Sequence, residues 1–346
     1  MDFTHQLLNW YKKHKRSLPW RTTTNPYYIW LSEIILQQTR IEQGLPYYEA
    51  FTTKFPTLKD LATADEDAVL KLWQGLGYYS RARNLHFTAQ YIYNELNGVF
   101  PKSYAEIIKL KGIGPYTAAA IASFAHKEPV AVVDGNVFRV LARFFGIYDD
   151  IAATKTRAFF QNLANELIST KHPDLFNHAI MDFGATVCLP ANPKCNSCIF
   201  NENCFAFLKN EIAQLPVKKK KISVKNRYLN YLILKNDNEI VIQQRTEKDI
   251  WQQLFELPLI ETSTDNEEEF FLHLSNLYPN NNIKKVTANT IKHKLSHQQL
   301  HINFYEINVS NFRSNQQTSA IQDLHNYAYP IVMWNFLKDF FTLEKI

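Results

Sequence analysis

All four cysteines of this 346-residue chain lie in one short stretch. Thiolates are soft ligands that bind zinc or iron–sulfur clusters. The spacings of six, two and five residues differ from the paired Cys-x2-Cys knuckles of common zinc sites, and disulfides are rare in cytosolic proteins. Uneven ligands on a tight loop favour an iron–sulfur cube, with zinc or disulfides as the alternatives. The predicted ligands are Cys188, Cys195, Cys198 and Cys204.

Two carboxylates have surroundings that suit acid chemistry. Glu33 lies in the apolar segment Trp30–Thr39 (WLSEIILQQT). Apolar surroundings raise the pKa of a carboxyl group, and a carboxylic acid that is neutral at pH 7 can donate a proton. Asp134 follows the apolar run Val130–Val133 and precedes a predicted helix. It can serve as a helix N-cap, or as a carboxylate that stabilises positive charge developing on a sugar. For Glu33 the structural alternative is a side chain that points to solvent.

The segment Leu110–Ala118 (LKGIGPYTA) has the pattern of a helix-hairpin-helix. Gly112 and Gly114 allow a tight turn and a close approach of the backbone to phosphate. Backbone N–H groups at the start of the next helix would then face the anion, which holds DNA without reading its sequence. An ordinary glycine turn between helices is the alternative. A second glycine turn, Gly75–Arg83, also leads into a predicted helix.

The elements that position these residues are mainly helical up to about residue 212. Helical spacing of apolar residues predicts an all-α domain. The predicted helices lie near residues 5–15, 27–38, 41–54, 65–73, 78–96, 103–109, 115–126, 135–145, 155–169 and 173–184.

A linker and a second, α+β domain follow the helical part. Pro216 and the run Lys218–Lys221 indicate the linker. A hairpin is predicted from the apolar segments 227–235 and 239–245 and the turn at 236–238 between them. A further strand is predicted at 302–309, where apolar and polar residues alternate. Helical spacing of apolar residues predicts helices at 267–277 and 331–341.

Composition and charge allow a DNA-binding enzyme without requiring one. Apolar residues make up 46% of the chain, and the net charge is +5 with a pI near 8.8. Mild basicity permits a polyanionic partner. The first residues lack the plan of a signal peptide, and no apolar run is long enough to cross a bilayer. A cytosolic protein is therefore expected, without contact to membranes.

Together these motifs resemble the endonuclease III and MutY families of DNA glycosylases. The likeness is strong over residues 5–210 and looser over 225–346, and the WLSE–LQQT string is the feature most specific to the MutY family. The resemblance implies an all-α helix-hairpin-helix glycosylase domain over residues 1–213, with a 4Fe–4S loop at 188–204. It further implies a linker at 214–226 and an α+β Nudix-like (MutT-like) domain over residues 227–346. We find no paired-glutamate box in that domain, so it is expected to bind rather than hydrolyse.

The resemblance also implies the reaction. Glu33 would protonate adenine, Asp134 would stabilise the oxocarbenium-like sugar, and water would complete hydrolysis to an abasic site. Tyr116 stands where bifunctional members carry a lysine that forms a Schiff base, so a monofunctional enzyme is expected. Lys111, close in sequence, leaves open a weak substitute lyase activity. Asn136 and Asp182 match residues that line the family's pocket.

Further residues are implied to contact DNA. Gln38 and Tyr78 would insert beside the orphan base, Thr39 would contact it, and Arg81 and Arg83 would bind phosphates. Gly112 and Gly114 would present the hairpin backbone. The Leu295–His297 segment resembles the family's loop that reads 8-oxoguanine, in which Ser296 and His297 would contact the lesion.

The expected partner is double-stranded DNA with adenine opposite 8-oxoguanine or guanine. The protein is expected to be a monomer and to lie in the cytoplasm, associated with the nucleoid. Analogy with the family adds contact with a sliding clamp, although no clamp motif is evident in the sequence. The main rivals are a bifunctional glycosylase–lyase of the endonuclease III type and a non-catalytic DNA-binding protein with a structural or redox cluster. The presence of both Glu33 and Asp134 argues against the second rival.

Overall fold

The computed structural model describes residues 2–219 and 224–343, and the chain divides into two compact units. One unit contains the residues up to Thr63 and those from Asn84 onward to the linker. The other combines Ala64–Arg83 with the carboxy-terminal part of the chain. The residues 220–223 of the predicted linker lie outside the described residues.

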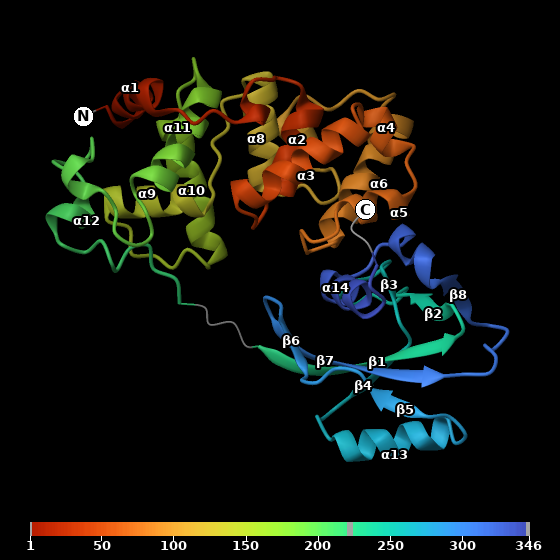
Figure 1. Cartoon of the computed structure of the whole chain (residues 1–346). Helices are drawn as coiled ribbons and strands as arrows, with labels where there is room; N and C mark the ends of the chain where they lie inside the picture. Colours follow the sequence, from red (N-terminus) through yellow and green to blue (C-terminus); the bar gives the residue numbers. More distant parts are fainter. Residues whose placement is uncertain (1, 220–223, 344–346) are drawn as a thin grey trace. The chain divides into compact units, whose positions relative to one another are not determined.

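The first unit is helical, as the periodicity predicted (Figure 1). The structure places each predicted helix within a few residues of its expected bounds and adds two short helices, α4 (Leu58–Ala62) and α12 (Phe205–Leu208). The helices that contribute to this unit are α1 (Phe3–His14), α2 (Pro26–Ile35), α3 (Ile41–Lys54), α4 (Leu58–Ala62), α6 (Ser80–Glu95), α7 (Tyr104–Ile107), α8 (Pro115–His126), α9 (Gly135–Phe145), α10 (Thr154–Leu167), α11 (Pro173–Thr186) and α12 (Phe205–Leu208), with the 3-10 turns η1 (Pro19–Arg21) and η2 (Cys195–Ser197).

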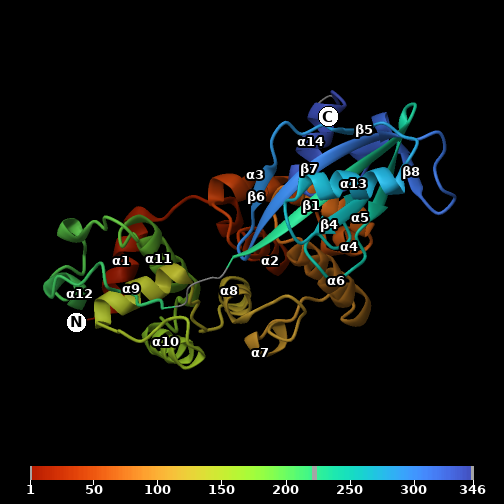
Figure 2. The same ribbon diagram turned by 90° about the horizontal axis from the view of Figure 1, so that it is seen from below.

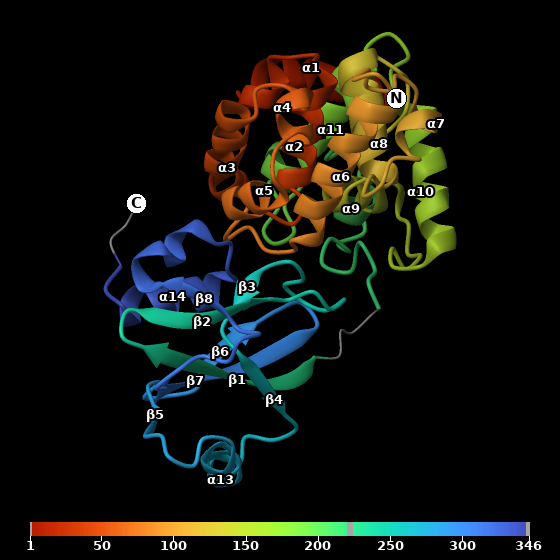
Figure 3. The ribbon, with the colours of Figure 1, turned by 90° about the vertical axis from the view of Figure 1, so that its right-hand side faces the viewer.

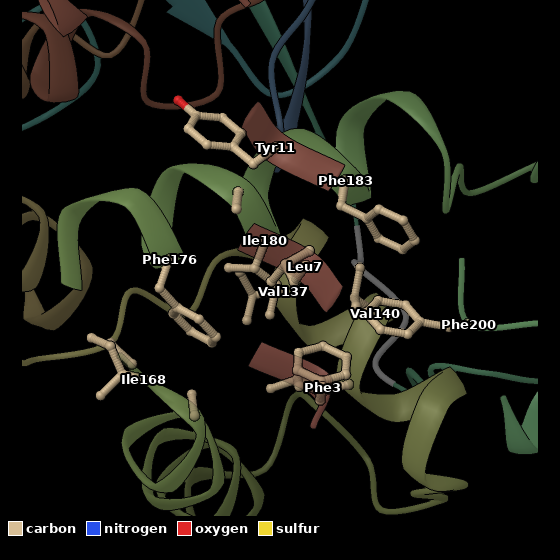
Figure 4. Packing of buried hydrophobic residues seen from close by; sticks show 14 of the residues in the cluster. Phe3, Leu7, Tyr11, Val137, Val140, Ile168, Phe176, Ile180, Phe183 and Phe200 are labelled. Carbon is tan, nitrogen blue, oxygen red and sulfur yellow. The ribbon is translucent and has the colours of Figure 1, made fainter. Parts of the chain in front are cut away.

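One hydrophobic core of this unit joins the helix after Asp134 to the cysteine segment. Helices α1, α9 and α11 lie near one another in Figures 1 and 2, and α11 contacts both α1 and α9. Val137 and Val140 on α9 share a face because they are three residues apart, and they pack into this core (Figure 4). Phe200, which lies between the third and fourth cysteines, stacks on Phe3 of α1 with ring centroids 4.6 Å apart. The core therefore fixes α9 and the cysteine segment together.

The second unit is built on a mixed sheet. Strand order is β3-β2-β1-β7-β5, with β4 paired to β1, β6 to β7 and β8 to β2. The long strands β1 and β7 pair in parallel, in the register Leu229↔Ile302, and the other pairs are antiparallel. The strands are β1 (Lys225–Asn236), β2 (Glu239–Gln244), β3 (Phe255–Glu256), β4 (Leu259–Thr262), β5 (Ile283–Lys285), β6 (Ile291–Lys294), β7 (Gln298–Asn308) and β8 (Gln317–Ala320).

Helices cover both faces of this sheet (Figure 3). Alternate residues of a strand point to opposite faces. Leu229 and Tyr231 of β1 belong to the core that α14 (Ile331–Phe340) covers. Leu232 belongs to the core that α13 (Glu267–Leu277) covers. The predicted hairpin and both predicted helices of this domain are confirmed, whereas five shorter strands and the turn η3 (Ile321–Asn326) were not predicted.

The segment Ala64–Arg83 contains α5 (Glu66–Leu72) and the second glycine turn, and it packs with the sheet unit. Lys71 donates to the carbonyl of Tyr327 at 3.2 Å, and its ammonium lies 4.6 Å from the Trp334 ring centroid. Arg83 donates to the carbonyl of Gln252 at 2.7 Å. This packing brings the glycine turn beside the carboxy-terminal strands, which no sequence pattern indicated.

Candidate active site

Glu33 lies on a helix that is almost entirely buried. Asn25 caps α2 by accepting a hydrogen bond from the Tyr27 N–H at 2.9 Å, and Pro26 occupies the first turn, where its missing N–H costs nothing. The next two turns are apolar on every side apart from Ser32 and Glu33. The Glu33 side chain does not point to solvent, because the residue is only 8% exposed.

The hairpin glycines are required by geometry. Gly112 has φ +78°, and a Cβ built there would lie 2.6 Å from Cβ of Asn84, so only glycine fits. Gly114 is the N-cap residue of α8, and Pro115 begins that helix. Both glycines are exposed. The hairpin thus presents its backbone at the surface and places Tyr116 in the first turn of α8.

Asp134 is a helix cap and a candidate catalytic group at once. Its Oδ1 accepts from the N–H groups of Asn136 at 2.9 Å and Val137 at 2.8 Å, which caps α9. Its Oδ2 accepts from Nδ2 of Asn136 at 2.7 Å. The N-cap alternative from the sequence is therefore correct, and the cap fixes the carboxylate in one orientation.

A chain of hydrogen bonds runs from Asp134 to the cysteine segment. Asn136 donates to Asp134 and accepts from Arg139 at 2.8 Å. Arg139 also donates to the carbonyl oxygens of Cys188 and Gly184, each at 2.7 Å. Asn136 is thus a positioning residue in this structure, and it connects the capped carboxylate to the first cysteine.

Glu33, Tyr116 and Asp134 line one cavity of about 520 Å³. Gln38, which has a left-handed backbone (φ 58°), lines it too, together with the hairpin residue Gly114. Sequence reasoning missed several wall residues that come from the segment before α2 and from α11, where no motif marks them. These are Arg16, Leu18, Trp20, Arg21 and Met181. Thr39, by contrast, hydrogen-bonds to the carbonyl of Gln37 and is not part of this wall.

The two carboxyl groups differ in their electrostatics. Burial raises the pKa of Glu33 to about 7. The hydrogen bond from the Tyr116 hydroxyl lowers it, the nearby charge of Asp134 raises it, and Arg21 lowers it. Burial also raises the pKa of Asp134, while the hydrogen bonds from Val137 and Asn136 oppose that rise. Glu33 is therefore partly protonated near neutral pH and can donate a proton there.

Asp182 plays a different part from the one expected. It is completely buried on α11 and is not among the residues that line the cavity. It pairs with Arg16 at 2.6 Å and with Arg21 at 2.7 Å. Burial alone would raise the pKa of Asp182, but the hydrogen bonds and charge of Arg21 hold it below its usual value. Asp182 thus fixes two arginines that do line the cavity.

The second unit contains its own pocket, of about 430 Å³. Tyr78, Arg83, Ser296 and His297 line it, and the hydroxyls of Tyr78 and Ser296 contact each other. Tyr78 has φ 48° and is 48% exposed. The remaining lining residues are Leu76, Gly77, Tyr79, Ser80, Asp249, Ile250, Trp251, Lys294, Leu295 and Gln298.

Arg81 and Arg83 interact with the protein itself. Arg81 donates to the carbonyls of Leu76 and Gly77 and lies 5.0 Å from the Trp73 ring centroid. Arg83 holds the main chain at Gln252 by donating to its carbonyl oxygen. Both guanidinium groups therefore stabilise the loops around this pocket.

The four cysteines line a single pocket, which Arg143 shares. Donors face their sulfurs: Arg143 lies 3.5 Å from Sγ of Cys188, and the Phe200 N–H lies 3.4 Å from Sγ of Cys198. Within the described residues no three ligating side chains are close enough to hold one metal ion. Four soft thiols that share one pocket are a donor set that an iron–sulfur cluster can use.

Two known protein families match different parts of the chain. Residues 31–166 match the HhH-GPD superfamily of base excision DNA repair proteins, and residues 230–339 match the NUDIX domain family. No helix in the described part of the chain is long and apolar enough to span a membrane.

Individual relatives extend the likeness over most of the chain. An adenine DNA glycosylase of Buchnera aphidicola (subspecies Baizongia pistaciae) is 40% identical over 331 residues, which are 94% of this chain and 92% of that protein. The adenine DNA glycosylase of Homo sapiens is 42% identical over 223 residues, covering 62% of this chain and 41% of that protein.

Solved structures resemble the helical part. A thermostable thymine-DNA glycosylase matches with a TM-score of 0.56 and 29% identity, covering 60% of this chain and 95% of that one. A trapped endonuclease III–DNA covalent intermediate matches with a TM-score of 0.53 and 21% identity, covering 60% of this chain and 94% of the other, which shows a shared fold.

Proposed function

Because this chain belongs to the adenine DNA glycosylase family of base excision repair, it is an enzyme that releases adenine from DNA, and we propose that this adenine lies opposite 8-oxoguanine or guanine. The observation that carries the proposed mechanism is the shared cavity of Glu33, Tyr116 and Asp134. An enzyme that acts on a base must extrude it from the duplex into such a cavity.

The proposed reaction uses the two acids in sequence. Adenine leaves its sugar readily only when its ring is protonated, and Glu33, with a pKa of about 7, supplies a proton to N7. Positive charge then develops on the sugar. The Asp134 carboxylate, oriented by its hydrogen bonds with Asn136 and Val137, stabilises that charge until water adds.

The enzyme is proposed to be monofunctional. Tyr116 has no amine that could form a Schiff base with the sugar. Lys111, the alternative nucleophile in the sequence, places its ammonium 4.0 Å from the Phe87 ring centroid and does not line the cavity. Borohydride should therefore trap little protein on abasic DNA, and efficient covalent capture would refute this part of the proposal.

A 4Fe–4S cluster is proposed at Cys188, Cys195, Cys198 and Cys204. When bound, the cluster would hold the loop between α11 and α12 in one conformation. Arg139 hydrogen-bonds to the carbonyl of Cys188 and, through Asn136, to the carboxylate of Asp134. A loop held in one conformation would therefore help to keep the Asp134 carboxylate in its orientation.

DNA recognition is proposed to use both units. The backbone at Gly112 and Gly114 would hold phosphate, and Gln38 and Thr39 would reach the orphan base from the end of α2. Tyr78, Ser296 and His297 would read 8-oxoguanine at the second pocket. The N7–H of that lesion is a donor that guanine lacks, and the Ser296 hydroxyl can accept from it.

The deciding experiment measures single-turnover adenine release from three duplexes, with adenine opposite 8-oxoguanine, guanine or thymine. Alkali treatment then converts abasic sites to strand breaks. We expect breaks with the first two duplexes only after alkali, and fastest with 8-oxoguanine. Equal rates on all three duplexes would refute the proposed specificity, and strand breaks without alkali would refute simple hydrolysis.

A further inference from the structure

Arg227, at the start of β1, connects the two carboxy-terminal segments that line the second pocket. Its Nη1 and Nη2 donate to the two oxygens of Asp249 at 2.9 and 2.8 Å, and Nη1 also donates to Oε1 of Gln298 at 3.3 Å. Asp249 begins the wall 249–251, and Gln298 directly follows the Leu295–His297 turn. One guanidinium therefore bridges both walls.

The remaining donors of Arg227 are also engaged. Nε and Nη2 donate to the Glu261 carboxylate at 2.7 and 2.6 Å, and the arginine side chain is only 10% exposed. A guanidinium is a planar, rigid fork that binds carboxylates with two parallel hydrogen bonds. Anchored on β4 through Glu261, this fork holds Asp249 in a defined position rather than reaching toward a ligand.

Both walls are loops that connect neighbouring strands, β2 to β3 and β6 to β7. In the first wall, Trp251 has φ 60° and the nearby Gln253 has φ 67°, which are left-handed conformations that non-glycine residues adopt at a cost. The second wall is the turn between β6 and β7, closed by the hydrogen bond from the Leu295 N–H to the carbonyl of Gln298 at 2.8 Å. A side chain that contacts both loops, as Arg227 does, therefore helps to set the separation of the two walls.

Arg227 also neutralises a carboxylate that faces the pocket. Asp249 lines a site proposed to receive DNA, where a free negative charge would repel phosphate. Arg245 adds a second contact to Asp249 at 2.8 Å. Burial would raise the pKa of Asp249, but the hydrogen bonds and charge of Arg227, with the charge of Arg245, hold it below its usual value. The acid is thus a structural anchor.

We propose that Arg227 is a positioning residue for lesion recognition, which sets the separation of the Asp249–Trp251 wall from the Leu295–His297 turn. This inference rests on the proposed reading of 8-oxoguanine by Ser296. A hydrogen bond to one N–H weakens steeply as its distance or angle changes. Loosening the bridge between the walls should therefore reduce discrimination between 8-oxoguanine and guanine before it reduces adenine release itself.

The test compares Arg227→Lys with Glu267→Gln in the full-length protein. Lysine keeps the positive charge but cannot bind Asp249 with two hydrogen bonds and reach Gln298 at the same time. Glu267→Gln is the matched control, because it weakens an ion pair of the same unit, with Lys285, and neither of these residues lines the pocket. Single-turnover adenine release is measured opposite 8-oxoguanine and opposite guanine, along with the thermal midpoint.

For Arg227→Lys we expect the ratio of the two rates to fall about tenfold, the order of one lost hydrogen bond, with the rate opposite guanine nearly unchanged. Glu267→Gln should keep the wild-type ratio. The affinity for product duplexes, with an abasic analogue opposite 8-oxoguanine or guanine, should change in parallel. An unchanged ratio in Arg227→Lys, or equal losses on both substrates, would overturn the inference.

A second substitution covers the case in which Arg227→Lys does not fold. Gln298→Ala removes only the weaker contact on the second wall, and it should lower the same ratio by a smaller factor. A wild-type ratio in this variant would count against the bridge. If the wild-type protein shows no preference for 8-oxoguanine over guanine, the proposed specificity itself is refuted. If the wild type shows the preference and Arg227→Lys keeps it, only the positioning role of Arg227 is refuted.

Discussion

The catalytic cavity and the second pocket treat their carboxylates in opposite ways. Within the described residues Glu33 has no ion-pair partner, and burial raises its pKa to about 7. Asp249 is held by two arginines, and its pKa lies below its usual value. The first arrangement leaves a proton available near neutral pH, while the second fixes a charge and its geometry.

This difference separates the requirements of chemistry from those of recognition. A general acid works best when its pKa lies near the working pH, and that requires burial without a strong cation. A recognition pocket needs walls that do not move, and that requires fully paired charges. The helical unit contains both kinds of site, because Asp182 is paired with Arg16 and Arg21 beside the same cavity as Glu33.

The strongest test of the comparison is to remove the unpaired acid. Glu33→Gln keeps the size of the side chain but cannot protonate adenine, so we expect the single-turnover rate to fall by about 10²- to 10⁴-fold. Alkali-dependent strand cleavage measures this rate, and a gel-shift assay should show that DNA binding is retained. Full adenine release by this variant would mean that Glu33 is not the acid.

Removing a paired acid should instead cost stability. Asp182→Asn leaves Arg21 buried without its carboxylate, and we expect the free energy of unfolding to fall by about 3 kcal/mol or more. Asp174→Asn, on the same helix, breaks an ion pair with the exposed Lys127 and should cost about 1 kcal/mol or less. Denaturant titration of both variants gives the comparison, and equal losses would contradict it.

The unpaired acid should make stability depend on pH. The pKa of Glu33 is about 7 in the folded protein, above its ordinary value of 4.5, so the folded state is favoured at low pH and loses this advantage as pH rises through about 7. Glu33→Gln should therefore be more stable than the wild type at pH 8, by roughly 3 kcal/mol. The difference should shrink toward pH 5, and thermal midpoints at both pH values provide the measurement.

The smallest expected effect concerns Tyr116. Its hydrogen bond lowers the pKa of Glu33, so Tyr116→Phe should move the alkaline fall in the excision rate to higher pH. The wild-type rate should decline above about pH 7, approaching tenfold per pH unit. Single-turnover rates from pH 6 to pH 9 would show the displacement. A profile that moves to lower pH in this variant would be inconsistent with the hydrogen bond.

Much of the helical unit could be predicted because its signals are local. Periodicity, caps and the hairpin glycines depend on neighbouring residues, and the helices carrying Glu33, Tyr116 and Asp134 lie where the sequence placed them. The short strands of the second unit were missed because segments such as Ile283–Lys285 are stabilised by pairing with β7 rather than by their own pattern. The arginines around Asp182 were missed for the same reason, since their partners lie more than 160 residues away.

The sequence by itself determined which residue types are available: an acid in an apolar helix, a carboxylate at a helix start, a hairpin and four grouped thiols. Only the tertiary structure decided which of these groups meet, which acids are paired and which is left to hold a proton. Local patterns set backbone conformation, whereas burial and ion pairing depend on distant segments that fold against each other. The roles of Arg227 and Asp182 could therefore be read only after folding had brought their partners together.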